Sequence, residues 1–326
     1  MCDQSSVLLV GAGGMAAAYA KVLKAMNIVP VVLGRGAASA EKFAAETGIR
    51  AQPGVLAEQL ADIPTDLAAI VTVNAHALAE VTGQLIDHGI KRILVEKPAA
   101  LDVIEMSDLL VKAKAVNAEV YVAYNRRFLS SVIAADRIIS EDGGLVSLRF
   151  DFSEPARRIG ALGKHPRELN TWFYGNSTHV IDLAFHFFGA PEVLEARIAG
   201  QNGVDWHPDA GVFVGFGHRA DQATIAWHAN WISPGRWGME ILTKERRLIL
   251  QPLEKLRMQT HDSFAEVEFT LDDKNDQHFK PGILRQTRAF LTGEDKDRLV
   301  TLENHAMNMK FYEAIRTGQS FGKTGT

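Results

Sequence analysis

The first third of the chain alternates short apolar runs with stretches of helical period. The apolar runs are continuous, as expected of strands covered on both faces, and lie at Val7–Val10, Val29–Leu33, Leu67–Val73, Ile93–Val95 and Val120–Ala123. The helical patterns between them lie at residues 15–26, 38–47, 77–87 and 102–116. This alternation predicts an α/β domain over residues 1–124, built as a doubly wound parallel sheet of the Rossmann type.

After residue 124, apolar and polar residues begin to alternate with a period of two, first at Val146, Leu148, Phe150 and Phe152. Similar segments lie at residues 212–216, 223–228, 239–243, 247–250 and 266–271, with a predicted hairpin around residues 244–246. We therefore expect residues 125–326 to form an α+β domain with a large, mostly antiparallel open sheet. A last helical pattern at residues 302–316 can pack back on the first domain.

Composition narrows the class of protein. The 326 residues are 47% hydrophobic, which is enough for two packed cores, and the net charge of -4 creates no strong field for nucleic acid or an anionic membrane. No apolar run approaches the ~20 residues that span a bilayer. The one cysteine, Cys2, excludes a disulfide within the chain, and no secretory signal is recognisable, so we expect a cytoplasmic protein. No His/Cys spacing indicates a metal site.

A glycine-rich turn follows the first apolar run and opens the first helical pattern. In the sequence Gly11-x-Gly13-x-x-Ala16, Gly11 permits a tight turn and Gly13 lets the backbone approach a pyrophosphate. Ala16 keeps the helix close to the strand. We interpret this turn, with Gly14 and Met15 inside it, as the phosphate loop of a dinucleotide site; a purely structural turn is the alternative.

The end of the second predicted strand bears on the choice of cofactor. Sites that prefer NAD usually carry Asp or Glu there, bonded to the ribose 2′-hydroxyl. This chain has Arg35 between two glycines and no carboxylate. A guanidinium suits a 2′-phosphate, so we expect NADP, with NAD as the alternative cofactor and an ordinary exposed arginine as the alternative role.

A lysine ends another predicted strand, in the sequence Glu96-Lys97-Pro98. Ligands of open α/β sheets bind beyond the carboxyl ends of the strands, which places Lys97 at the expected site. Its ammonium group can hold a hydroxyl or carbonyl oxygen and pass a proton. From its position alone, Lys97 can equally well be a solvent-exposed lysine at the end of a strand, with no role in binding. Pro98 fixes the turn, with a cis bond as one way of doing so.

Five elements together resemble the glucose–fructose oxidoreductase / inositol dehydrogenase / MocA family of nicotinamide-dependent oxidoreductases. They are the Gly11–Ala16 loop, the turn at Asn74, Glu96-Lys97-Pro98, Asn125–Phe128 and the segment His179–Gly189, in the family's order. The resemblance implies a dinucleotide-binding first domain and a second domain whose open sheet makes a dimer or tetramer. It also implies a small carbohydrate-like substrate between the domains.

The resemblance implies roles for individual residues. Lys97 and His179 match the family's catalytic lysine and histidine. Thr72, Val73 and Asn74 would line the nicotinamide, with Glu96 and Lys97 also beside the cofactor. The substrate would contact Lys97, Arg126, Asn176 and His179.

The chain departs from the family before His179. Typical members carry Asp four residues or Glu three residues earlier, whereas this chain has Gly175 and Asn176. An amide can bond a substrate hydroxyl but cannot accept its proton at neutral pH. Lys97 and His179 therefore remain the only titrating pair that matches the family, and His179 alone can serve as the acid–base group.

Basic residues gather between the first alternating strand and His179. Arg157, Arg158, Lys164 and Arg167 lie among glycines and a proline, which predicts a loop. Such a loop suits an anionic substrate such as a nucleotide sugar or sugar acid, and it also fits a solvated surface.

These observations together predict an NADP(H)-dependent oxidoreductase that transfers a hydride to or from a carbohydrate-like substrate. Two alternatives stay open. One is a reductase of an imine or another unsaturated bond, in which Lys97 mainly positions the substrate. The other is a dinucleotide-binding sensor without catalytic activity, which the missing acid before His179 permits.

Overall fold

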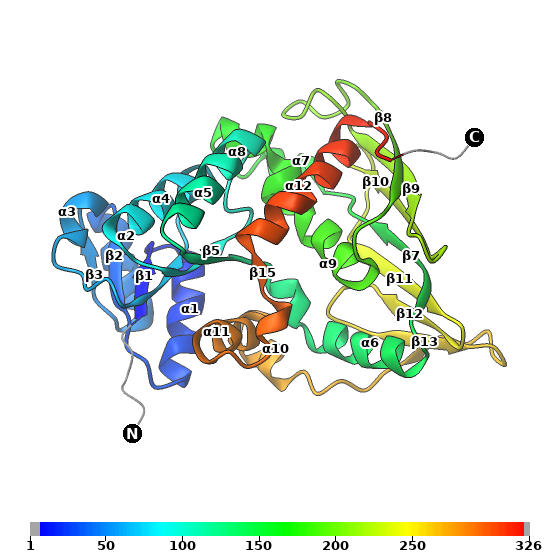
Figure 1. The fold of residues 1–326 in the computed structure, drawn as a ribbon, viewed down its shortest axis with the longest axis horizontal. Helices are drawn as coiled ribbons and strands as arrows, with labels where there is room; N and C mark the ends of the chain where they lie inside the picture. The colour runs from blue at the N-terminus through cyan, green and yellow to red at the C-terminus, as the bar shows by residue number, and fades with distance from the viewer. Residues whose placement is uncertain (1–6, 323–326) are drawn as a thin grey trace. The chain divides into compact units, whose positions relative to one another are not determined.

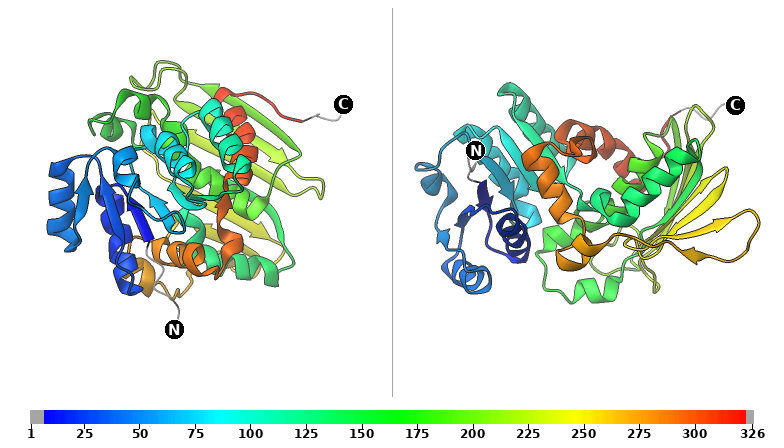
Figure 2. Two further views of the ribbon diagram at one scale, coloured as in Figure 1. Left: turned by 60° about the vertical axis from the view of Figure 1, so that its left-hand side comes forward. Right: turned by 90° about the horizontal axis from the view of Figure 1, so that it is seen from below.

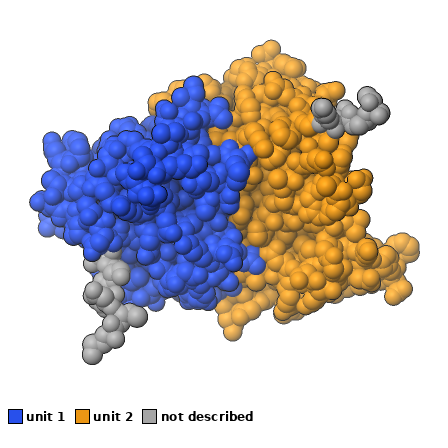
Figure 3. Space-filling view, in the orientation of Figure 1, with its two compact units in different colours: residues 1–125, 275–307 blue, residues 126–274, 308–326 orange. Residues whose placement is uncertain are grey.

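The computed structural model describes residues 7–322, and the chain divides into two compact units (Figure 3). Unit 1 comprises residues 1–125 and 275–307, and unit 2 comprises residues 126–274 and 308–326. The patterns along the chain predict one boundary, between residues 124 and 125; in the structure, residues 275–307 also belong to unit 1. In the described part of the chain, no helix combines the length and apolarity that a membrane crossing requires.

Unit 1 is built on a parallel sheet, as expected. Its strands run in the order β15 (Val300–Thr301), β6 (Glu119–Ala123), β5 (Arg92–Glu96), β4 (Ala68–Val71), β1 (Val7–Val10), β2 (Val31–Gly34) and β3 (Ala51–Pro53). The short strand β15 is antiparallel to β6, and the other pairs are parallel. Strand order reverses between β1 and β4, and such a reversal opens a crevice at the carboxyl ends of the strands.

The helices of unit 1 lie between the strands, at α1 (Gly14–Ala25), α2 (Ala37–Thr47), α3 (Leu56–Leu60), α4 (Leu78–His88) and α5 (Val103–Ala115), with a 3₁₀ turn η1 (Ala75–Ala77). The Asp102 carboxylate starts α5 by accepting from two backbone N–H groups, and Gly48 and Gly89 end α2 and α4 in the left-handed conformation. The sequence predicted four of these helices to within a residue or so.

A second passage of the chain completes unit 1. It contains α11 (Ile283–Thr292), the 3₁₀ turn η4 (Lys296–Arg298) and β15, and it is preceded by the one-turn helix α10 (Lys274–His278). Helix α11 lies beside α1 (Figures 1 and 2). The long helix α12 (Leu302–Thr317) begins in unit 1 and continues in unit 2.

Unit 2 contains the predicted large sheet, with eight strands. Their order is β14 (Val267–Glu268), β13 (Arg257–Thr260), β12 (Arg246–Leu250), β11 (Gly238–Thr243), β7 (Leu145–Asp151), β10 (Thr224–Asn230), β9 (Val212–His218) and β8 (Val193–Ala199). Neighbours are antiparallel except β7 and β10, which pair in parallel. Strands β11 and β12 form the expected hairpin around residues 244–246.

The helices of unit 2 lie on one face of this sheet (Figure 2). They are η2 (Asn125–Phe128), α6 (Ser130–Glu141), α7 (Ala156–Gly160), α8 (Pro166–Asn170), the π-helical turn η3 (Phe173–Ser177) and α9 (Thr178–Phe188). An aromatic cluster of Phe152, Phe173, Phe213 and Trp231 fills the core.

The predicted alternation of buried and exposed side chains is interrupted at the start of β7. Val146 is 46% exposed, and its neighbour Leu145 is buried instead. The register with β11 shifts between Leu242 and Thr243, so that Thr243 pairs with Leu145. This irregularity turns Leu145 toward the core and corrects the expectation that Val146 faces inward.

The basic segment is not the loop that the sequence predicted. Helix α7 contains Arg157 and Arg158, and α8 begins at Pro166. Ala156 and Ile159 point one helical face into the core, while Pro166 occupies the first position of a helix, where it is favourable. Both arginines of α7 are exposed.

Candidate functional site

The glycine turn of unit 1 is shaped to receive an anion. A Cβ atom on Gly11, whose φ is +119°, would lie 2.5 Å from Thr72 Oγ1, so only glycine fits. A Cβ on Gly13 or Gly14 would meet no heavy atom of the described chain within 4 Å. Gly13 is the N-cap of α1, which carries no acidic residue in its first turn. The helix therefore presents its positive end and open backbone to the crevice.

A cavity of about 550 Å³ lies at the carboxyl ends of β1, β2 and β4 in unit 1. It brings together six residues that the sequence assigned to the cofactor: Gly11, Gly13, Arg35, Thr72, Val73 and Asn74. Gly14, Met15 and Ala16 belong to α1, which starts at this turn. The cavity is thus large enough for a nucleotide and sits where doubly wound sheets bind one.

The cavity wall also contains residues that the sequence motifs do not assign to the cofactor. The segment Gly54–Ala57 and the side chains of Ser39, Gln59, His76, Glu80 and Gln84 also line it. Gln59 Nε2 donates to the carbonyl of Gln52 at 2.7 Å, which fixes α3 against β3. No local motif marks these residues, because the packing of α2, α3 and α4 and of the turns before α3 and α4 brings them to the site.

Arg35 is exposed at the end of β2, directly after Gly34. It lines the cavity with Ser39, whose hydroxyl donates to the Gly36 carbonyl at 2.9 Å. Gly36 is the N-cap of α2, which has no acidic residue in its first turn. A guanidinium, a hydroxyl and a helix N-terminus therefore surround the place where an acidic ribose ligand is usual.

Lys97 follows β5, the strand beside β4, and its peptide bond to Pro98 is cis. The turn is held by His305, whose Nε2 donates to the Pro98 carbonyl at 3.0 Å. Lys97 and Glu96 are half-buried and lie outside the residues that line the cavity.

The Glu96 carboxylate accepts from Tyr19 Oη at 3.1 Å. Burial raises the pKa of Glu96, and the ammonium groups of Lys97 and Lys280 oppose that rise. Burial beside Glu96 also raises the pKa of Tyr19 well above its ordinary value. Lys97 therefore stands beside a carboxylate that favours its charged form.

His179 is in unit 2, on the first turn of α9 and 8% exposed. Its ring centroid lies 5.9 Å from that of Trp237, and the Arg126 guanidinium carbon lies 5.8 Å from the centroid of Trp237. Arg126 Nη1 donates to Glu254 Oε1 at 2.6 Å. His179 and Arg126, two residues predicted for the substrate, thus contact the same indole.

A buried carboxylate lies beside Asn176, one of the positions before His179 where the sequence differs from typical members of the family. Glu154, 2% exposed, follows β7 and accepts from Asn176 Nδ2 at 2.9 and 3.2 Å through its two oxygens. Ser177 Oγ also donates to Glu154, at 2.9 Å. Since Nδ2 is held by the carboxylate, Asn176 Oδ1 remains as an acceptor. No sequence pattern marks Glu154 as a site residue, because it lies 22 residues from Asn176 along the chain.

Asn176 belongs to the π-helical turn η3, which enters α9. Turns of this kind widen a helix and occur often at functional sites. The turn places Asn176 and Ser177 beside Glu154. Asp182, farther along α9 and 1% exposed, accepts two hydrogen bonds from the Arg127 guanidinium at 2.8 and 2.7 Å, so this buried carboxylate is paired within the fold. Within residues 7–322, no group of three or more His, Cys, Asp or Glu residues could hold a metal ion.

Known proteins resemble the chain in sequence and in fold. Residues 5–124 match the model of a family described as an oxidoreductase family with an NAD-binding Rossmann fold. An uncharacterized oxidoreductase of Schizosaccharomyces pombe is 28% identical over 151 residues, which are 45% of this chain and 40% of that protein. The match thus spans less than half the length of this curated relative.

Solved structures match nearly the whole chain at low identity. An NAD binding oxidoreductase from Klebsiella pneumoniae has a TM-score of 0.76 and 16% identity, covering 99% of this chain and 100% of that one. UDP-N-acetylglucosamine 3-dehydrogenase from Acidithiobacillus ferrooxidans has a TM-score of 0.74 and 17% identity, and the match covers 96% of this chain and 97% of that one. An oxidoreductase from Agrobacterium radiobacter has a TM-score of 0.77 and 14% identity, and the match covers 98% of both chains. That structure is a complex with NAD⁺, L-tartaric acid and magnesium.

The family match falls on the residues that form the cavity of unit 1, and the structural matches share the fold of both units. The resemblance expected from the motifs is therefore confirmed. Residues 5–124 thus match the NAD-binding domain of the glucose–fructose oxidoreductase / inositol dehydrogenase / MocA family of oxidoreductases.

Proposed function

We propose that the chain is an NADP(H)-dependent oxidoreductase acting on a carbohydrate-like substrate. The observation that carries this proposal is the 550 Å³ cavity of unit 1, with the glycine turn in its wall and Lys97 at the end of the neighbouring strand. When bound, the nicotinamide supplies or accepts the hydride. The protein supplies the binding of phosphates, the orientation of the substrate and the movement of a proton.

The proposed roles follow from the chemistry of each side chain. Lys97, charged beside Glu96, holds and polarises the reacting oxygen. His179 exchanges the hydroxyl proton, as an imidazole can. Asn176 offers Oδ1 as an acceptor to a second substrate hydroxyl, because Glu154 holds its Nδ2.

We further propose that Glu154 takes over the positioning role of the acid that typical members carry before the histidine. The carboxylate is supplied by the end of β7 rather than by α9, and it reaches Asn176 at 2.9 Å. Asn176 stands at one of the positions where relatives carry the acid. This arrangement favours an enzyme over a sensor that has lost its acid.

Arg157 and Arg158 extend the proposal to an anionic substrate. Both are exposed on α7, which directly follows Pro155 and Glu154. The UDP-sugar enzyme among the solved structures supports the same substrate class. Arg157→Ala and Arg158→Ala should raise KM for a nucleotide sugar by about tenfold or more, and equal KM values would remove this part of the proposal.

Cofactor binding is tested by a matched pair of glycine variants. Gly13→Ala should keep the melting temperature and lose NADPH binding, because its methyl group occupies open space reserved for the cofactor. Gly11→Ala should lose stability as well, on the order of 3 kcal/mol, because its backbone conformation and contacts forbid a side chain. NADPH binding by Gly13→Ala equal to that of the unmodified protein would contradict the proposal.

Catalysis is tested separately from binding. A panel of sugars, sugar acids and nucleotide sugars, followed at the absorbance of NADPH, should reveal turnover that Lys97→Ala or His179→Ala lowers by ~10²–10⁴-fold. Cofactor binding without turnover on any member, unaffected by His179→Ala, would favour the sensor.

A further inference from the structure

A lysine from the second passage of unit 1 reaches the glycine turn. Lys280 Nζ lies 2.7 Å from Sδ of Met15, the second residue of α1. The two residues are 265 positions apart in the sequence. Lys280 is exposed, so its ammonium group stands at the positive end of α1 with access to solvent.

The turn that carries Lys280 is fixed by the backbone on both sides. The Pro281 carbonyl accepts from Asn125 Nδ2 at 2.8 Å, and the Gly282 N–H donates to Asp276 Oδ1 at 2.9 Å. Gly282 has a φ of +78°, and a Cβ there would lie 2.0 Å from the Asn125 carbonyl oxygen. No other residue than glycine fits this close approach, so the path of the chain at residues 280–282 is determined.

The helix that follows this turn is anchored to α1. Tyr19 Oη and the Gln286 side-chain amide lie 3.2 Å apart, and with its amide turned over Gln286 also accepts from the backbone N–H groups of Tyr124 and Asn125. Tyr19 and Gln286 are both fully buried. Lys280 is therefore presented to the glycine turn by a rigid support.

The charged groups around the glycine turn favour the binding of an anion. The ammonium groups of Lys280 and Lys97 both oppose the rise in the pKa of the Glu96 carboxyl group, which accepts a hydrogen bond from Tyr19 of α1. The first turn of α1 holds no acidic residue. A thioether such as that of Met15 is a weak acceptor, whereas a phosphate oxygen makes a short charge-assisted bond with an ammonium group.

We propose that Lys280 binds the pyrophosphate of the dinucleotide from the side opposite the backbone N–H groups of the glycine turn. The cofactor site is then made by two separate passages of the chain, and the second contributes a charge that the N-terminal motif lacks. This inference rests on the proposed cofactor binding and adds a ligand to it.

Lys280→Gln tests the inference, with Lys24→Gln as the control. Lys24 is an exposed lysine on the last turn of the same helix, at the end remote from the glycine turn. We expect Lys280→Gln to weaken NADPH, NADH and ADP-ribose by about tenfold each in calorimetric titration, because all three contain the pyrophosphate. AMP, which lacks it, should bind as before, and Lys280→Arg should recover most of the affinity.

The outcomes separate the two proposals. If the unmodified protein binds neither NADPH nor NADH, the proposed function fails and the inference with it. If it binds them and Lys280→Gln binds them equally well, at an unchanged melting temperature, only the inference is overturned. It is also overturned if Lys280→Gln weakens NADPH and leaves ADP-ribose unaffected, since the contact would then be with the nicotinamide end.

Discussion

At the residue scale, we propose that Arg35 decides the choice between NADP and NAD. The guanidinium lines the cavity at the end of β2, where a carboxylate would select the free ribose of NAD. Arg35→Ala should lower NADPH affinity by about tenfold and leave NADH affinity nearly unchanged, as measured by fluorescence titration. A ratio of the two affinities equal to that of the unmodified protein would contradict NADP preference.

The contact between Glu154 and Asn176 permits an exchange experiment. Asn176→Asp places two carboxylates about 3 Å apart in a buried place and should cost about 2 kcal/mol of unfolding free energy. Glu154→Gln removes the charge that orients Asn176. The double variant Glu154→Gln/Asn176→Asp restores one donor and one carboxylate, so its urea midpoint should return close to that of the unmodified protein.

The same double variant addresses function as well as stability. It returns the carboxylate to the position where typical members of the family carry it. Turnover lost in Asn176→Asp and regained in the double variant would support the positioning role. If all three variants retained full turnover on a substrate found with the panel, the role of Glu154 would be structural only.

Single residues at the phosphate loop and at the strand ends were accessible to sequence reasoning, because each lies in a short motif. Gly11, Gly13, Arg35 and Thr72, which the motifs predict to bind the cofactor, line the cavity. Glu154 and Lys280 could not be found in this way. Their partners lie 22 and 265 residues away, and neither occupies a recognisable spacing.

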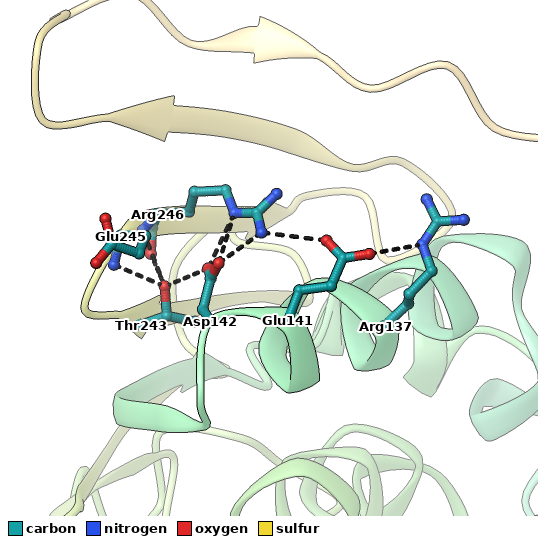
Figure 4. Close-up of polar contacts among 6 residues, drawn as sticks. All are labelled: Arg137, Glu141, Asp142, Thr243, Glu245 and Arg246. Carbon is teal, nitrogen blue, oxygen red and sulfur yellow. Dashed lines mark hydrogen bonds and ion pairs between the residues drawn. The ribbon is translucent and has the colours of Figure 1, made fainter.

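At the scale of elements, the hairpin of β11 and β12 is fastened to the end of α6 by one buried carboxylate. Asp142, whose side chain is 4% exposed, takes bonds from Arg246 and from Thr243 Oγ1 (Figure 4). The Thr243 hydroxyl in turn accepts the backbone N–H groups of Glu245 and Arg246, which closes the turn. The hydrogen bonds from Arg246 hold the pKa of Asp142 below its usual range.

This pKa predicts a dependence of stability on pH. The folded state binds the Asp142 proton less tightly than the unfolded chain, so the contribution is complete above the unfolded pKa of about 4. It is lost as pH falls through the lower folded pKa. Asp142→Asn should cost about 3 kcal/mol at pH 7 and progressively less below pH 4 in urea unfolding.

Glu141 is the matched control for Asp142. It neighbours Asp142, contacts the same Arg246 at 3.2 Å and Arg137 at 3.5 Å, but its side chain is 51% exposed. Glu141→Gln should therefore cost no more than ~1 kcal/mol, because exposed ion pairs are weak. Equal costs for the two variants would show that burial does not decide the strength of this cluster.

The sequence predicted strands and helices best where one pattern dominated. The prediction of a loop at the basic segment is wrong. Gly160 and Pro166 are typical of loops, but here they belong to the short helices α7 and α8. Gly160 instead lies against Trp206, where a Cβ would approach to 2.9 Å, and Trp206 Nε1 donates to the Ala156 carbonyl at 3.0 Å. Tertiary packing of an indole thus holds a one-turn helix that local propensity disfavours.

At the scale of the whole molecule, the outer face of the large sheet is the proposed site of self-association. Phe216 on β9 is 52% exposed and Val214 is 38% exposed, on the face opposite the helices. Farther along the same face, Arg149 of β7 and Arg247 of β12 both bond Glu240 of β11. Exposed apolar side chains beside satisfied charges are typical of protein interfaces.

Phe216→Glu tests this proposal by light scattering. The unmodified chain should be a dimer or tetramer, and the charge on β9 should reduce it to a smaller species without changing its helical content. Phe264→Glu is the control, because Phe264 is fully exposed but lies in the turn after β13 rather than on the sheet. A monomer before any substitution would contradict self-association.

The second passage of the chain through unit 1 has a consequence for biosynthesis. The sheet of unit 1 can pair its first six strands once residue 123 has left the ribosome, but β15, which borders β6, ends at residue 301. Helix α11, which covers α1, is also translated late. The nascent N-terminal part of unit 1 must therefore wait, with one flank of α1 and one edge of its sheet uncovered, until residues 283–301 have emerged.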